Sequence, residues 1–565
     1  MLETSGRLLT RRALLAGMAV VGSGTLLQAC SSLSPGQAVA TNAPAATATP
    51  VPAGAPSGAG QLANTVVFGS SGEPITMNPL LDDSANSRNV WELIFEGLVR
   101  PDPMVGTPTP WLAESWTTSP DGLTWQFKIR PNVKWSDGQP FTADDVKFTF
   151  QMVLDPKTKT PFRTRFDNVA SFDAPNPATF EVTLKGPDCP FLSTTMLVGI
   201  IPKHLLQGAA DINTDEFNSS RPVGTGPFMY KEWRRGEFLS LVANPNHWRG
   251  RPKIDQWIRR PTANDNVTTQ LLKTGEIDYS AVAPTAVADL SAEPSLQFVS
   301  VSSPTSIIYV AYNLDRPLFQ DKRVRQALSH GVDRQGILDS VLFGLGDLVD
   351  SAIPFQSWAR SDNVPTFRYD LEAARKLLTE AGWTPGPDGI LQKDGSRFAF
   401  TLSIQSGDQR RLGVATIAQD AWRRLGMQVQ IEQLEAAALT SKYLQAHDFD
   451  AIVGGGLGFT IDPDQTRFWA AKEFPGGANF VHYNNPAVDR LLDQARTVPG
   501  CDPAARKALY EQFQQIISED QPWTFLYSAR NPVVINKRIQ NAALSAWVGA
   551  GPYLAWGIND WTIAR

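Results

Sequence analysis

Residues 113–153 read AESWTTSPDGLTWQFKIRPNVKWSDGQPFTADDVKFTFQMV and carry the clearest local pattern in the chain. Apolar and polar residues alternate in TWQFKIR (124–130), which predicts a half-buried strand with turn dipeptides on both sides. The run from Thr142 to Asp145 has the pattern of a capping box, so a helix is expected to begin there. The stretch therefore predicts a compact unit of strands and a helix with one hydrophobic side.

Length and composition limit the classes of protein that the chain can belong to. With 565 residues it is too long for one hydrophobic core, so two or three domains are expected. The net charge is -5 and no basic stripe is present, which argues against a nucleic-acid partner. Three Cys and five His exclude a scaffold built on many disulfides or zinc ions, and no metal or other cofactor is expected.

Residues 1–29 have the pattern of an export signal. A basic start containing Arg11 and Arg12 resembles a twin-arginine signal, and the apolar run after it is too short to span a bilayer. The sequence LQAC, ending at Cys30, resembles a bacterial lipobox and predicts Cys30 as the lipidated first residue of the mature protein. An uncleaved anchor or a plain signal cut elsewhere remain alternatives. Each of the three places the folded part outside the cytoplasm.

Residues 30–61 are expected to form a lipid-anchored, flexible linker. They are rich in Ala, Pro, Thr, Ser and Gly, and lack both charge and a periodic apolar face. Such a segment cannot bury enough apolar surface to offset the entropy of ordering it. A lipid anchor followed by a linker holds a protein at the outer face of the cell membrane, or in the periplasm, while leaving it free to move.

The rest of the chain alternates predicted strands and helices. SIIYVAYN (306–313) is a continuous apolar strand, and residues 449–453 form another that runs into a glycine-rich loop. Asp370 is expected to cap a helix over 371–381, and a second helix begins at Pro503. This alternation in both halves predicts α/β domains.

Several motifs, in their residues and in their order along the chain, resemble those of one known family. Residues 113–153, PVGTGPF (222–228) and LLKTGEID (271–278) are similar to the corresponding segments of the oligopeptide/dipeptide/nickel family, family 5, of extracytoplasmic solute-binding proteins of ABC importers. The resemblance implies an α/β, bilobed periplasmic-binding-protein fold, type II-like, with an extra inserted domain. Its implied division of the chain is lobe 1 in 62–88, 222–302 and 529–565, the inserted domain in 89–221, and lobe 2 in 303–528.

The resemblance also implies a function without catalysis. The two lobes would close on an oligopeptide by a hinge motion, and an ABC permease in the membrane would then receive the ligand from the closed, monomeric protein. A secreted hydrolase remains as an alternative class, although the chain contains no G-x-S-x-G, H-E-x-x-H or G-x-x-x-x-G-K-[ST] motif.

The loop GGGLGFTIDPD (454–464) is the best candidate for ligand contact. In the resembled peptide binders an aspartate of this loop pairs with the peptide's α-ammonium, and neighbouring backbone adds to the extended ligand like a strand. An ungapped alignment places Phe459 at the aspartate position and Gly456 at the position of the usual Trp. The residues expected to bind ligand are Thr76, Met77, Gly455, Gly456, Leu457, Phe459, Asp462 and Trp469.

The residue at position 459 has a physical consequence for the ligand. A buried ammonium group without a carboxylate partner costs several kcal/mol. A protein with Phe459 should therefore prefer a ligand that carries no charge at that end, such as a blocked or long peptide. An oligosaccharide also fits, so an oligosaccharide-binding importer component is the alternative function, and the 16 Trp residues favour it.

The cysteines and histidines are expected to have structural roles. Cys189 and Cys501 could pair in an exported protein, but the resemblance places them in the inserted domain and in lobe 2. A bridge there would restrain a hinge that must open, so free buried thiols are expected. The five histidines are scattered along the sequence and are expected to be ordinary surface or core residues rather than ligands: His204, His247, His330, His447 and His482.

Overall fold

The computed structural model describes residues 64–104, 106–354, 356–455, 462–542 and 557–564. These residues belong to one compact unit, Gly58–Arg565. The expected signal peptide, the linker with Cys30, and the loop residues Gly456, Leu457 and Phe459 lie outside the described residues. Within the described ranges, no helix has the length and apolar character needed to cross a membrane.

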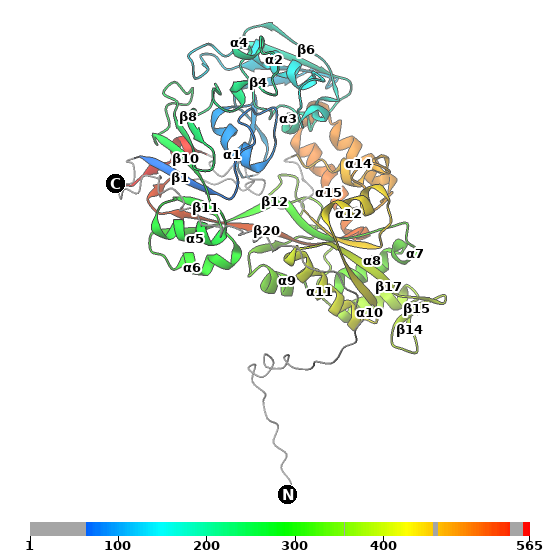
Figure 1. Ribbon diagram of the computed structural model, residues 1–565. Helices are drawn as coiled ribbons and strands as arrows, with labels where there is room; N and C mark the ends of the chain where they lie inside the picture. Colours follow the sequence, from blue (N-terminus) through cyan, green and yellow to red (C-terminus); the bar gives the residue numbers. More distant parts are fainter. Residues whose placement is uncertain (1–63, 105, 355, 456–461, 543–556, 565) are drawn as a thin grey trace, which may run out of the picture. The chain divides into compact units, whose positions relative to one another are not determined.

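An eleven-stranded mixed sheet is the largest element of the structure (Figure 1). Its strands, in spatial order, are β18 (Gln428–Leu434), β17 (Ala399–Gln405), β19 (Ala451–Gly455), β12 (Leu296–Tyr312), β20 (Trp523–Asn536), β11 (Tyr279–Ala281), β1 (Thr65–Ser70), β10 (Gln256–Pro261), β9 (Phe238–Ala243) and β8 (Phe228–Arg234), with β13 (Gly346–Leu348) also paired to β20. Parallel and antiparallel pairs both occur, so the expected α/β class is confirmed.

The two longest strands, β12 and β20, are antiparallel neighbours in the middle of this sheet (Figure 1). Their register shifts between Ser302 and Ile307. The beginning of β12 places Leu296 in a small core with residues of α5 (Asp265–Thr274), whereas its end places Tyr312 in a different core. One pair of strands thus connects two separately packed regions.

Helices cover the part of the sheet formed by β12 and β17–β20. They are α8 (Lys322–His330), α9 (Arg334–Val341), α10 (Leu371–Glu380), α11 (Gln409–Arg424), α14 (Pro486–Arg496) and α15 (Pro503–Asp520). The cap expected at Asp370 is present, since its carboxylate accepts hydrogen bonds from the backbone N–H groups of Glu372 and Ala373.

The unit predicted around residues 113–153 is confirmed. Strands β4 (Ala113–Thr118), β5 (Thr124–Ile129), β7 (Thr179–Leu184) and β6 (Val169–Asn176) form a four-stranded antiparallel sheet, and α2 (Ala143–Leu154) packs on it. The Asp145 carboxylate accepts from the backbone N–H of Thr142 at 3.0 Å, as the capping-box pattern predicts. It also accepts from the indole of Trp135 and from the backbone of Lys203, which joins α2 to its surroundings.

The remaining α-helices and strands lie outside the groups described above. They are α1 (Ala85–Ile94), β2 (Val99–Pro101), β3 (Pro108–Pro110), α3 (Phe191–Thr194), α4 (Lys203–Leu206), α6 (Val287–Ser291), α7 (Pro317–Gln320), β14 (Thr384–Pro385), β15 (Leu391–Lys393), β16 (Ser396–Arg397), α12 (Ala436–Thr440), α13 (Thr466–Trp469), β21 (Ile539–Gln540) and β22 (Thr562–Ile563).

The expectation that Cys189 and Cys501 are free thiols is wrong. The two residues form a disulfide bond with a Cα–Cα distance of 5.3 Å. The backbone N–H of Cys189 also donates to the carbonyl of Arg496 at 2.8 Å, so the turn before α3 is docked on the end of α14 (Figure 1). The bridge spans 312 residues of sequence, which is why local pattern gave no sign of it.

Candidate functional site

The candidate ligand loop begins where β19 ends, and its first residues are packed tightly against β12. Gly454 pairs with Tyr309, and Gly455 pairs with Ile308. A Cβ atom at position 454 would collide with the Tyr309 ring, and one at position 455 would collide with the Ile308 side chain. The buried Tyr309 ring therefore favours glycine at position 454, whereas a side chain at position 455 would require Ile308 to move.

Arg411 is a residue of this region that reading the sequence did not identify. It lies in the first turns of α11, and its Nη2 donates to the carbonyl of Gly455 at 3.1 Å. Its Nη1 donates to the Gln405 side chain at 3.1 Å. The loop therefore starts beside a guanidinium group. The only sequence signal was an arginine soon after the Asp408 cap, which is common on any helix surface.

Asp462, where the loop ends, is held by a buried ion pair. Both of its carboxylate oxygens contact Arg506 of α15, at 2.7 and 3.0 Å, and the Asp462 side chain is 1% exposed. Arg506 additionally donates to the hydroxyl of Tyr510 and to the carbonyl of Ala495. In this arrangement the Asp462 carboxylate orders the residues that follow the loop.

Two residues further on, Asp464 connects the loop to the segment 89–221. Its carboxylate contacts Nη1 of Arg496 at 3.2 Å, and Nη2 of Arg496 contacts Asp188 at 2.9 Å. Burial raises the pKa of both carboxyl groups, while the charge of Arg496 acts in the opposite direction. This chain of charges lies beside the disulfide, because Asp188 directly precedes Cys189.

Trp469, at the end of α13, lies in the core formed with residues of β12 and α15. Its ring is fully buried, with its centroid 4.5 Å from that of Trp523 and 5.9 Å from that of Tyr483. The ring therefore packs against other aromatic rings in the interior.

Thr76 and Met77 are buried in a different core from Trp469. The hydroxyl of Thr76 and the backbone N–H of Met77 both donate to the carbonyl of Asn218, at 3.2 and 2.8 Å. The neighbouring Ile75 is 71% exposed, although it is large and apolar. Within this segment the exposed side chain is thus Ile75 rather than the two that the sequence singled out.

Of the candidate residues, the structure brings Gly455, Asp462 and Trp469 into one region and assigns Met77 to another core. Arg411 joins the first group through its hydrogen bond to Gly455, and the Asp188–Arg496–Asp464 chain joins it through Asp464. None of these residues forms a nucleophile–base pair; their contacts suit holding a loop in place rather than transferring protons.

Known proteins resemble the chain over most of its length. The family model for bacterial extracellular solute-binding proteins, family 5, matches residues 107–477. The oligopeptide-binding protein AppA of Bacillus subtilis is 32% identical over 488 residues, which is 85% of this chain and 89% of that protein.

Solved structures extend the comparison to the fold. The structure of Bacillus subtilis AppA in complex with a nonapeptide has a TM-score of 0.68 at 31% identity, and covers 89% of this chain and 99% of its own. The structure of NikZ from Campylobacter jejuni in complex with Ni(L-His) has a TM-score of 0.70 at 28% identity, and covers 88% and 99%. The bilobed α/β fold expected from the sequence is thereby confirmed.

Proposed function

Because the chain belongs to family 5 of the bacterial extracellular solute-binding proteins, we propose that it is the solute-binding component of an ABC importer and that its ligands are oligopeptides. The observation that carries this proposal is the similarity to AppA over 85% of the chain, since AppA is named as an oligopeptide-binding protein and its structure contains a nonapeptide. The protein binds the ligand between two lobes and delivers it to a membrane permease without changing it chemically.

The proposed lobes meet at the register shift between β12 and β20. Lobe 1 comprises 62–88, 222–302 and 529–565, the inserted domain 89–221, and lobe 2 303–528. The register shift after Ser302 in the β12–β20 pair supports a crossover there, as does the separation of the cores at the two ends of β12. Ligand that contacts both lobes stabilises the closed form, which is how a binding protein couples capture to closure.

We place the ligand beside the loop that begins at Gly455. The ladder with β17 includes only Ala451 and Ile452, whereas β12 pairs with all of β19. An extended peptide can therefore hydrogen-bond to backbone beyond the β17 ladder, as in strand addition. Arg411, whose Nη1 also lies 3.5 Å from the Asp408 carboxylate, lies at this point, and we expect it to contact a polar group of the ligand. Phe459, in the loop, would favour a ligand end without a free ammonium group.

The leader and linker support a location outside the cytoplasm. In this proposal residues 1–29 direct export, Cys30 carries the lipid, and residues 30–61 tether the folded unit to the outer face of the membrane. Replacement of Cys30 by Ser should release the protein into the medium or periplasm. Retention of the Cys30→Ser protein in the membrane fraction would contradict the lipid anchor.

Calorimetric titration of the mature protein with matched ligands tests the proposal. We expect an unfractionated peptide pool to bind, an acetylated nonapeptide to bind more tightly than the same peptide with a free amino end, and Phe459→Asp to reverse that order. Binding of an oligosaccharide pool with no response to either peptide would replace the proposed ligand by the alternative. Arg411→Met should weaken peptide binding, whereas Arg423→Met, on the exposed side of the same helix, should not.

A further inference from the structure

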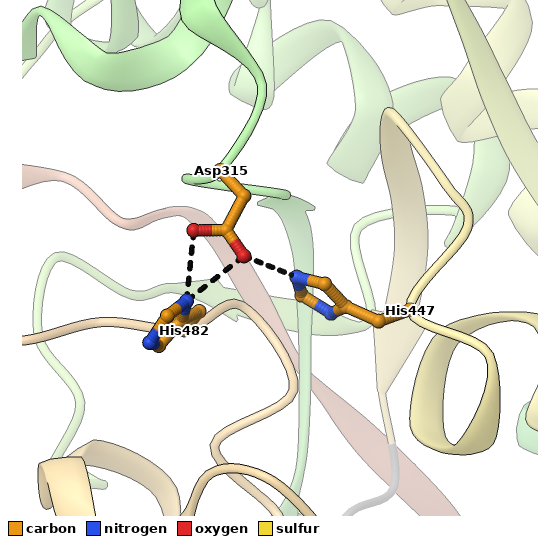
Figure 2. A group of neighbouring side chains, drawn as sticks. All are labelled: Asp315, His447 and His482. Carbon is orange, nitrogen blue, oxygen red and sulfur yellow. Dashed lines mark hydrogen bonds and ion pairs between the residues drawn. The ribbon is translucent and has the colours of Figure 1, made fainter.

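Two histidines from distant segments meet the carboxylate of Asp315 (Figure 2). Asp315 follows β12, His447 precedes β19 and His482 precedes α14. Nε2 of His447 lies 3.0 Å from Oδ2 of Asp315, and Nδ1 of His482 lies 2.8 Å from both carboxylate oxygens. His447 and His482, which lie far from Asp315 in the sequence, are therefore brought together by the fold.

The two imidazole rings are held in place by their surroundings. Both histidines have left-handed backbone, with φ of 52° at His447 and 57° at His482, a conformation that is uncommon outside glycine. The ring of Phe474 stacks on His482 at 3.9 Å between centroids and meets the edge of His447 at 4.8 Å. Packing and backbone together point both rings at Asp315.

We propose that Asp315, His447 and His482 form a binding site for a divalent first-row transition ion, for which Zn²⁺ is the probe. Two imidazole nitrogens and one carboxylate are a donor set that such ions prefer, and hard ions such as Mg²⁺ do not. The potential ligand atoms lie within 4.8 Å of one another. Ligands about 2.0–2.2 Å from a tetrahedral ion lie roughly 3.3 Å apart, so small movements suffice.

The neighbouring charges favour a cation. Arg316, the next residue, is paired with Asp448 at 2.8 Å and with Asp450 at 3.2 Å, so two carboxylates offset its charge. The Asp315 side chain is 50% exposed and that of His482 is 36% exposed. An ion can therefore enter from solvent, and water can complete its coordination.

This site is separate from the candidate ligand loop. Asp315 and His447 flank the end of the β12–β19 ladder where Tyr312 pairs with Ala451, whereas the loop starts at the other end, at Gly455. The five residues of β19 span roughly 13 Å between them. An ion here would link three segments of the chain and stabilise them without touching the ligand, so the inference does not depend on the proposed function.

The test compares the untagged protein with single variants in the presence and absence of ZnCl₂. His447→Asn and His482→Asn each remove one ligand, and Asn tolerates left-handed backbone. Asp315→Asn removes the carboxylate. The matched control is His204→Asn, because His204 also contacts a carboxylate, that of Asp137 at 2.7 Å, outside the proposed site. Circular dichroism without metal verifies that each variant is folded, and MgCl₂ replaces ZnCl₂ as the hard-ion control.

We expect Zn²⁺ to raise the melting temperature of the wild-type protein and of His204→Asn, and Mg²⁺ to leave both unchanged. Each of the three site variants should bind Zn²⁺ at least about tenfold more weakly by calorimetry. No Zn²⁺ response in the wild type, a full response in both histidine variants, or an equal loss in His204→Asn would each overturn the proposal. Two independent histidine variants keep the test decisive if one fails to fold.

Discussion

Among single side chains, the ion pair of Asp462 and Arg506 shows how a residue near the candidate loop is used. Both side chains are at most 5% exposed, and the pair is completed by the hydroxyl of Tyr510. A buried charge is tolerated only when it is paired and hydrogen-bonded. The pair therefore fixes the position of the chain immediately after the loop.

Removal of Arg506 should destabilise the protein strongly, because it leaves the Asp462 carboxylate buried without its cation. We expect Arg506→Met to lower the free energy of unfolding by about 3–5 kcal/mol in urea denaturation. The control is Lys376→Ala, which breaks an exposed ion pair with Glu380 and should cost less than about 1 kcal/mol. Equal effects of the two substitutions would show that the buried pair does not order this region.

A second side chain makes stability depend on pH. Burial raises the pKa of Glu92, in α1, to about 8, and the charges of Arg88 and Arg100 offset only part of this effect. The folded protein therefore binds a proton at neutral pH that the unfolded chain releases near pH 4–5. Below that range Glu92 is protonated in both states and its full contribution to stability is present. As pH rises toward 8 the free energy of unfolding falls and this contribution is lost.

Glu92→Gln should accordingly flatten the pH dependence of stability. Between pH 5 and pH 8 we expect the wild type to lose up to about 1.4 kcal/mol per pH unit relative to the Glu92→Gln variant, measured by urea denaturation at each pH. Glu372→Gln, at an exposed position of α10, serves as the control and should follow the wild type. A Glu92→Gln curve parallel to the wild-type curve would contradict the raised pKa.

Of the secondary-structure elements, β19 bears most directly on the candidate site. It is a short strand with β12 on one side, and Tyr309 and Ile308 of β12 occupy the space that side chains at its last two positions would need. A strand that ends in two glycines lets β12 approach closely and leaves no bulky side chain where the loop starts.

Gly455→Ala should disturb both stability and binding. The added methyl group forces Ile308 or the strand to move, at a cost of about 1–3 kcal/mol in the free energy of unfolding. Gly186→Ala is the matched control, because a methyl group added there would meet no atom within 4 Å, and it should change stability by less than about 0.5 kcal/mol. If peptide affinity falls in Gly455→Ala and not in Gly186→Ala, the entry to the loop matters for the ligand.

Across the molecule, the disulfide connects the proposed inserted domain to the proposed lobe 2. Cys189 and Cys501 close a loop of 312 residues, and the Asp188–Arg496–Asp464 charges lie next to them. Any closing motion between these parts must therefore turn about this contact or keep it intact. Free thiols were expected because a bridge between the inserted domain and lobe 2 would restrain the opening of the hinge. The disulfide shows that these two segments are nevertheless joined.

Loss of the bridge should lower stability and loosen this contact. We expect Cys189→Ser to reduce the free energy of unfolding by about 2–5 kcal/mol, because the unfolded chain gains freedom when the long loop is opened. If the proposed closure is right, bound peptide should also exchange faster in this variant. Cys30→Ser keeps the bridge and is the control. Unchanged stability in Cys189→Ser would exclude a structural role of the bridge.

Local sequence was sufficient for much of the fold. The alternation in 124–130, the capping box at Thr142 and the cap at Asp370 each predicted the element that formed, because these signals act between residues a few positions apart. The family motifs supplied the two-lobed architecture, and the solved relatives confirm it. The sequence also located the glycine-rich end of β19, although not the reason for its glycines.

The partners of individual side chains were decided only by the tertiary structure. Cys189 meets Cys501 across 312 residues, Asp462 meets Arg506 across 44, and Asp315 is reached by His447 and His482 from segments more than 130 residues away. Trp469 is fully buried and packs against Trp523. Such contacts depend on how whole elements pack, and packing is set by many weak long-range interactions that no local pattern of residues encodes.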